Sequence, residues 1–133
     1  ENFVSKGGYI VENCEGKPEI IFIATGSEVS LAIESAKLFS NRKTRVISMP
    51  CLELFEEQSK QYKEELLPER GCSKVSLEAG ITQGWHKYTG PTGLNIGLDH
   101  YGSSAPGSVL AEEFGFTPSN VYNKINEHLN KLL

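Results

Sequence analysis

IIFIATGSEVSLAIESAKLF, residues 20–39, is the stretch that decides the fold of this 133-residue chain. Its first five residues, Ile20 to Ala24, are apolar without interruption, which is typical of a strand covered on both faces. After a short turn, Val29, Ala32 and Ile33 begin an apolar pattern with helical spacing. A buried strand that leads into an amphipathic helix is the first half of a β-α-β unit. The stretch therefore predicts a parallel sheet covered by helices.

Four more strands are predicted around this unit. One lies before it, at residues 9–12, and three follow, at residues 45–49, 74–77 and 95–98. The loop of residues 13–19 is too short for a parallel crossover, so the first strand is expected to run antiparallel to its partner. If it pairs with the strand at Ile20, that pair is antiparallel. The predicted fold class is a three-layer α/β/α arrangement around a five-stranded mixed sheet, mostly parallel with one antiparallel edge strand.

Three further helices are predicted after the first one. Residues 52–67 show a helical pattern that Pro68 stops, and Ser59 can cap a second piece, so a break is expected there. Pro106 begins a short helix that Gly115 ends. Thr117-Pro118 opens the last helix. Residues 1–8 end in two glycines and are predicted to be a linker from a preceding domain, with the domain itself at residues 9–133.

Composition and charge exclude several function classes. The net charge of −4 disfavours binding to nucleic acid or to an anionic membrane. No apolar run approaches the ~18 residues that a membrane crossing needs, and the N-terminal ENFVSKGG lacks the apolar core of a signal peptide. The three cysteines are odd in number and form no CxxC pair, so free thiols in a cytoplasmic protein are expected. Since Met49 is the sole methionine, we expect the chain to be part of a longer protein.

Polar side chains follow the carboxyl ends of the predicted parallel strands, where ligands of open α/β sheets bind. The turn at residues 25–28 could hold an anion at a helix N-terminus. However, it has one glycine and no lysine, and Glu28 puts a carboxylate where a phosphate would lie. A helix capped by Ser27 is the favoured interpretation. The candidate ligand or docking residues at this edge are Gly26, Ser27, Glu28, Glu78, Trp85, His86, Asp99 and His100.

No catalytic, cofactor-binding or metal-binding residue is predicted. Cys51 could pair with His86 or His100 as a nucleophile, but a lone thiol after a strand is more often a packing residue. The histidines show no HxxxH spacing for a metal. Glu78 and Asp99 could act as general acid and base, although capping or salt bridging of the glycine-rich loops is favoured. The aromatic loop around Trp85 is either a plug for the core or a docking surface.

Four motifs stand out along the chain: IATGSEVSLAIESA, VISMPCLELFEEQ, SLEAGITQGWHKYTG and IGLDHYGSSAPGSVLAEEFGFT. Together they resemble the C-terminal domain of transketolases. The resemblance runs from about Gly7 to the end of the chain, with the motifs in order and at the right spacing. His100 departs from it, since many members carry Arg in the corresponding D-R-F-G stretch. Dihydroxyacetone synthase, a close relative with the same domain, is the alternative.

The resemblance implies a parent enzyme whose chemistry lies in other domains. Transketolases are homodimeric transferases of the pentose phosphate pathway that move a two-carbon ketol unit between ketose and aldose phosphates. They use thiamine diphosphate and a divalent metal, Mg or Ca, held by the first two domains. No cofactor is expected in this chain, which would serve a structural or regulatory role. Its expected partners are the preceding domains, the second subunit of a homodimer and, for the parent, sugar phosphates.

Two other hypotheses concern the chain by itself. In one, the turn at residues 25–28 makes it a regulatory module that binds a small anion. In the other, the domain only supports the dimer. In the main interpretation, the loops at residues 78–88 and 99–106 are expected to contribute to docking onto the preceding domain and the second subunit.

Overall fold

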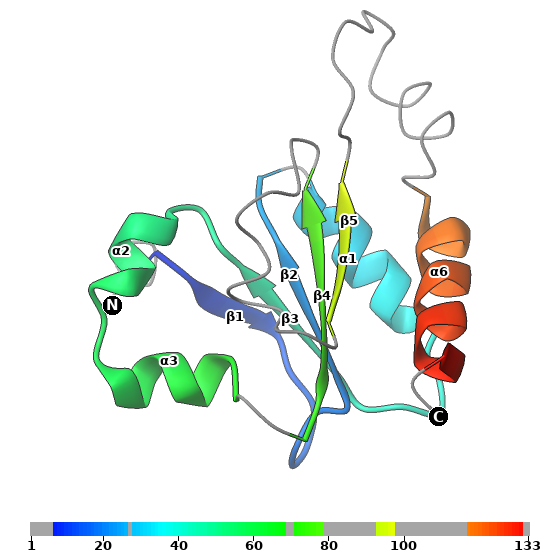
Figure 1. Cartoon of the computed structure of the whole chain (residues 1–133), viewed down its shortest axis with the longest axis horizontal. Helices are drawn as coiled ribbons and strands as arrows, with labels where there is room; N and C mark the ends of the chain where they lie inside the picture. The colour runs from blue at the N-terminus through cyan, green and yellow to red at the C-terminus, as the bar shows by residue number, and fades with distance from the viewer. Residues whose placement is uncertain (1–6, 27, 69–70, 79–92, 98–116, 132–133) are drawn as a thin grey trace, which may run out of the picture.

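The computed structural model describes residues 7–26, 28–68, 71–78, 93–97 and 117–131, which form one sheet with helices on both faces (Figure 1). The sheet has five strands in the order β1-β3-β2-β4-β5. The predicted short helix at residues 106–114 lies outside the described residues. The strands are β1 (Tyr9–Glu12), β2 (Ile20–Ala24), β3 (Thr44–Ser48), β4 (Ser73–Glu78) and β5 (Leu94–Gly97).

The predicted mixed sheet, mostly parallel with one antiparallel strand, is confirmed. β2 pairs in parallel with β3 and β4, and β5 pairs in parallel with β4. β1 is the antiparallel strand, and it pairs with β3. A pairing of β1 with the strand at Ile20 does not occur, because β3 and β4 already occupy both edges of β2. The outer edge of β3 is what remains open to β1.

The central strand β2 supplies both faces of the core. All five of its residues have no exposed surface. Ile20, Phe22 and Ala24 belong to one apolar cluster, while Ile21 and Ile23 belong to a second cluster on the opposite face. The uninterrupted apolar run therefore reflects burial on both sides of the sheet, as its composition predicts.

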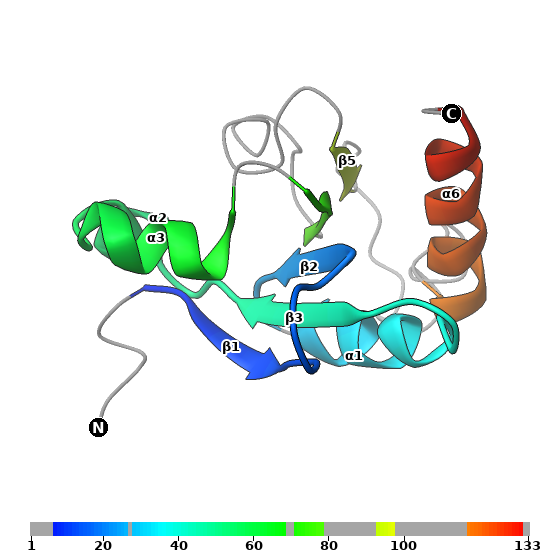
Figure 2. The same ribbon diagram turned by 90° about the horizontal axis from the view of Figure 1, so that it is seen from below.

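Two pairs of helices cover the two faces (Figures 1 and 2). The helices α1 (Glu28–Lys37) and α6 (Pro118–Lys131) contribute to the cluster around Phe22. The helices α2 (Leu52–Glu56) and α3 (Lys60–Leu66) contribute to the cluster around Ile23. The arrangement thus has three layers. In the part of the chain that the structure describes, no helix combines the length and the apolar character needed to cross a membrane.

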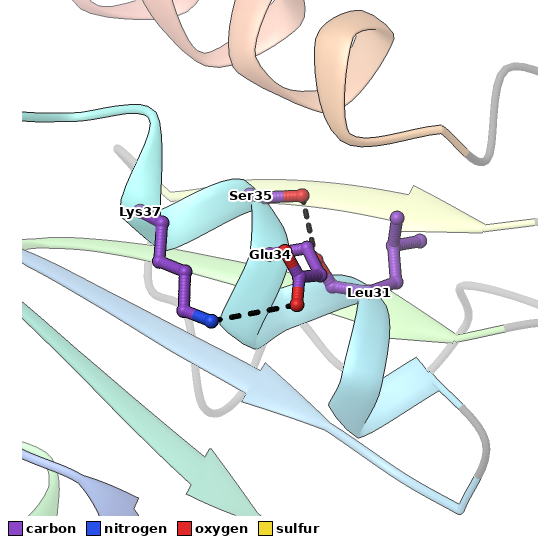
Figure 3. Close-up of polar contacts among 4 residues, drawn as sticks. All are labelled: Leu31, Glu34, Ser35 and Lys37. Atoms are coloured by element: carbon purple, nitrogen blue, oxygen red, sulfur yellow. Dashed lines mark hydrogen bonds and ion pairs between the residues drawn. The ribbon is translucent and has the colours of Figure 1, made fainter.

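The buried polar residue of α1 is satisfied within the helix. Ser35 has no exposed surface, and its hydroxyl donates a hydrogen bond of 2.7 Å to the carbonyl of Leu31 (Figure 3). This bond removes the cost of burying an unpaired hydroxyl. On the outer face of the same helix, Lys37 and Glu34 form an exposed ion pair at 3.5 Å, which contributes little to stability.

The predicted helix at residues 52–67 is two helices, and the predicted break at Ser59 is confirmed. Ser59 is the N-cap of α3, where its hydroxyl oxygen accepts a hydrogen bond of 3.1 Å from the amide of Tyr62. The break changes which side chains face the core. Phe55 and Leu66 are buried as expected, whereas Leu54 is an exposed apolar side chain.

We expect Ser59→Ala to lower the free energy of unfolding by about 1 kcal/mol, because the amide of Tyr62 loses its acceptor. Urea unfolding monitored by circular dichroism measures the change. Ser59→Asp is the matched control, since its carboxylate can accept the same bond and should keep the stability close to that of the parent chain. Equal stability of Ser59→Ala and the parent chain would contradict the assignment of the cap.

The chain enters the domain through two tightly packed glycines. Gly7 has a φ of 80°, and its carbonyl accepts a hydrogen bond of 3.1 Å from the amide of Cys51. The carbonyl of Gly8 accepts a bond of 2.6 Å from the hydroxyl of Tyr62. Both glycines are buried. They connect the start of β1 to both helices of the α2–α3 layer.

Candidate functional site

The sheet has two edges at which strand ends gather. We define the carboxyl edge by Ala24, Ser48 and Glu78, the last residues of β2, β3 and β4. Figure 1 shows the arrowheads of β2, β4 and β5 at the same side of the sheet. We define the amino edge by the first residues of the same three strands, at positions 20, 44 and 73.

The structure describes part of the predicted site at the carboxyl edge. Gly26 lies on the turn between β2 and α1, and Glu28 is the first residue of α1, so both lie at the start of this helix. Glu78 ends β4, where its backbone pairs with Gly97. The other candidates stay predictions, because they lie outside the described residues; they are Ser27, Trp85, His86, Asp99 and His100.

The turn between β2 and α1 closes on itself. The amide of Glu28 donates a bond of 3.0 Å to the carbonyl of Thr25, and the amide of Val29 donates a bond of 3.3 Å to the carbonyl of Gly26. Amides at the start of a helix hold an anion only while they lack a partner in the protein. Two of these donors are already engaged, which favours a structural turn over an anion cradle.

Cys51 lies at the carboxyl edge as the N-cap of α2. Its thiol is 3.7 Å from a carboxylate oxygen of Glu53 and makes no side-chain cap for the helix. The hypothesised partners His86 and His100 lie outside the described residues, so the nucleophilic pair stays untested. Within the described ranges, no group of three or more His, Cys, Asp or Glu side chains is placed to hold a metal ion. All three cysteines of the chain are free thiols.

The amino edge carries a cationic cluster that the sequence analysis missed. Lys74 of β4 and Arg45 of β3 are both aligned with Ile21 of β2, so the three side chains form one row across the sheet. Ile21 belongs to the apolar cluster beneath α2 and α3, which places the row on that face. Lys74 is only 7% exposed. The sequence showed Lys74 only as the first residue of a short predicted strand. The alternation of polar and apolar residues along a strand does not show which side chains the neighbouring segments will cover.

Arg45 is held in place by the end of α3. Its Nη1 donates bonds of 2.8 Å and 3.1 Å to the carbonyls of Glu65 and Leu66, and its Nε donates a bond of 3.0 Å to the side chain of Asn13. A cation at the C-terminal end of a helix also interacts favourably with the helix dipole. These bonds fix the guanidinium at the amino edge.

Cys72 lies beside this cationic cluster. Burial raises the pKa of its thiol, and Glu64 adds a small effect in the same direction. Lys74, Lys17 and Arg45 act against this shift, because positive charge stabilises the thiolate, but burial outweighs them. The sulfur lies 3.7 Å from the carbonyl of Pro68, to which a protonated thiol can donate a hydrogen bond.

The raised pKa predicts slow alkylation of Cys72. In a chain whose other cysteines are changed by Cys14→Ser and Cys51→Ser, iodoacetamide should modify Cys72 with a midpoint in pH above the ordinary thiol value. The same chain unfolded in urea serves as the control and should show an ordinary midpoint. A native midpoint below that of the unfolded chain would mean that the three cations outweigh burial.

Comparison with known proteins points to one family. Residues 7–117 match the family described as "Transketolase-like TK C-terminal domain". The chain is 51% identical over 126 residues to the transketolase of Aquifex aeolicus, a match that covers 93% of this chain and 18% of that protein. It is 44% identical over 128 residues to transketolase 1 of Escherichia coli, covering 95% of this chain and 19% of the relative. The chain therefore spans just under one fifth of the length of these relatives.

A solved structure of similar shape belongs to the same group. The transketolase from Leishmania mexicana superimposes with a TM-score of 0.86 at 38% sequence identity. The superposition covers 96% of this chain and 18% of the Leishmania chain. Both the sequence and the fold are thus similar to one segment of much longer proteins.

Proposed function

This chain belongs to the family of transketolase-like C-terminal domains, and from that premise we propose that it is the third domain of a transketolase. The parent protein would be a transferase that moves a two-carbon ketol unit between ketose and aldose phosphates in the pentose phosphate pathway. The observation that carries the proposal is the match to transketolases over more than nine tenths of this chain. Dihydroxyacetone synthase remains the alternative parent.

We propose that the chemistry of the parent lies outside this chain. Thiamine diphosphate and a divalent metal, Mg or Ca, would be held by the preceding domains, so the isolated chain would be inactive. At the turn of residues 25–28, two backbone amides already donate hydrogen bonds within the protein, which leaves fewer donors for a phosphate group. This supports the proposal that the cofactor binds in other domains. The same observation argues against the alternative of a regulatory anion site at Gly26, Ser27 and Glu28.

The proposed role of the domain is to dock onto the rest of the parent. Its partners would be the preceding domains, reached through residues 1–8, and the second subunit of a homodimer. The buried Gly7 and Gly8 support a firm attachment, since both carbonyls are bonded to the α2–α3 layer. The loops at residues 78–88 and 99–106, with Trp85, His86, Asp99 and His100, are proposed docking elements. Three free thiols support a cytoplasmic location.

Ketol transfer by the full-length gene product and by this chain, measured side by side, tests the proposal. The intact mass of each protein is determined first. We expect an active long parent that requires thiamine diphosphate and a divalent metal, and no activity from the 14.7 kDa chain. Activity of the short chain alone would overturn the proposed division of labour. Identifying which acceptor the active parent uses distinguishes a transketolase from dihydroxyacetone synthase.

A further inference from the structure

The chain enters the domain directly against the first turn of α2. A methyl group added to Gly7 would collide with the carbonyl oxygen of Cys51 and the amide nitrogen of Phe55, and would lie 2.9 Å from the carbonyl carbon of Leu54. Figure 1 shows the start of β1 beside this helix. Any part of a longer protein that is joined ahead of Gly7 therefore leaves the domain next to α2.

Two hydrogen bonds fix the backbone at this entry. The carbonyl of Gly7 accepts the amide of Cys51, the N-cap of α2, and the carbonyl of Gly8 accepts the hydroxyl of Tyr62 on α3. Of the proposed linker, only residues 1–6 lie ahead of these bonds. An extended chain of that length spans at most about 22 Å. A domain joined through this linker is therefore held close to α2.

The exposed side of α2 carries a large apolar side chain beside the entry. Leu54 is 37% exposed, and it is flanked by the exposed acids Glu53 and Glu57. In the part of the chain that the structure describes, neither carboxylate takes part in an ion pair. A single exposed leucine is common on protein surfaces. What distinguishes Leu54 is that its backbone touches the fixed point of entry.

We propose that the exposed side of α2, formed by Glu53, Leu54 and Glu57, is the surface onto which the preceding domain of the parent docks. This inference rests on the proposed function, because it takes that domain as the occupant. An apolar pocket for Leu54 with lysine or arginine at its rim would complement the surface. The short linker keeps the two surfaces at a high effective concentration, so a small contact area is enough to hold them together.

Hydroxyl-radical footprinting of the full-length gene product and of the 133-residue chain tests the surface. Mass spectrometry of peptides gives the oxidation rate at each leucine. We expect Leu54 to be oxidised severalfold more slowly in the full-length protein than in the short chain. Leu38 is the matched control, because it is 43% exposed and follows α1 in the other helical layer. Its oxidation rate should be the same in both proteins.

Leu54→Lys separates docking from folding. The side chain is exposed in the domain by itself, so the substitution should leave the thermal midpoint of the 133-residue chain unchanged. In the full-length protein it places a charge in the apolar contact, so the midpoint should fall and the oxidation rate at Glu53 and Glu57 should rise. Leu38→Lys should have neither effect in either protein.

Four results would overturn the docking surface. They are equal oxidation of Leu54 in both proteins, protection of Leu38 as strong as that of Leu54, protection of Leu54 that disappears in a monomeric fraction of the full-length protein, and destabilisation of the short chain by Leu54→Lys. The third result would assign the surface to the second subunit instead.

Ketol transfer by the same full-length sample reports on the proposed function separately. An active parent in which Leu54 is unprotected would overturn the docking surface alone. A parent without this activity in which Leu54 is protected and Leu38 is not would support the docking surface, and would overturn the proposed function.

Discussion

Gly7→Ala should lower the free energy of unfolding by about 3 kcal/mol. A methyl group at this position would collide with the carbonyl oxygen of Cys51 and the amide of Phe55, and would lie 2.9 Å from the carbonyl carbon of Leu54. These are backbone atoms at the start of α2, so they cannot turn away as a flexible side chain could. The φ of 80° adds strain for any residue with a side chain. Urea unfolding of both chains gives the difference.

Gly26→Ala is the matched control for this substitution. Gly26 also has a positive φ, of 53°, but a methyl group there would have no neighbour within 4 Å. The control therefore carries backbone strain without the collision, and we expect it to cost about 1 kcal/mol. Equal losses in the two variants would show that strain alone accounts for the effect, and that Gly7 is not tightly packed beneath α2.

Phe22→Ala is expected to lower the free energy of unfolding by about 4 kcal/mol, because it leaves a cavity between the central strand and the α1–α6 layer. Phe22 has no exposed surface, and its ring centre lies 6.2 Å from that of Phe39. Phe39 in turn lies 4.6 Å from the ring of Tyr122 on α6. The three rings connect the central strand to the last helix, so the loss should reach that helix. The free energy of unfolding and the amide exchange of α6 are the two measurements.

Phe22→Leu provides the comparison, since it keeps most of the buried volume and should show a clearly smaller loss. Amide exchange of α6 should then resemble that of the parent chain. If Phe22→Ala lowered the stability by less than 1 kcal/mol, the cluster on the α1–α6 face would not be the close-packed core described here.

The fold could be predicted where neighbouring residues carry the signal. The run from Ile20 to Ala24 gave a strand buried on both faces, and its five residues are fully covered. Ser59 was predicted to break a helix because a hydroxyl can accept an amide bond three residues ahead, and that bond is present. Both inferences depend on contacts within a few residues, which the sequence displays directly.

Features set by distant segments could not be predicted in this way. The partner of β1 depends on the pairing of β3 and β4 with the two sides of β2. The sequence pattern within a single strand does not show this pairing. The burial of Lys74 depends on the segments that cover its face of the sheet, and no nearby residue indicates it. The candidate ligand residues were placed at the carboxyl edge by analogy with other open sheets, and the row that Arg45 and Lys74 form at the amino edge was missed.

The direction of β1 determines how the domain can be attached to anything else. Its first residue, Tyr9, pairs with Ser48, so the chain arrives at the carboxyl edge and then runs toward the amino edge. A first strand parallel to its neighbours would have brought the chain in from the opposite side. If the domain is attached to a sensor surface or to a fusion protein through the residues before Gly7, the point of attachment therefore lies at the carboxyl edge. The amino edge, with Lys74 and Arg45, will then point away from the attachment and toward the solvent.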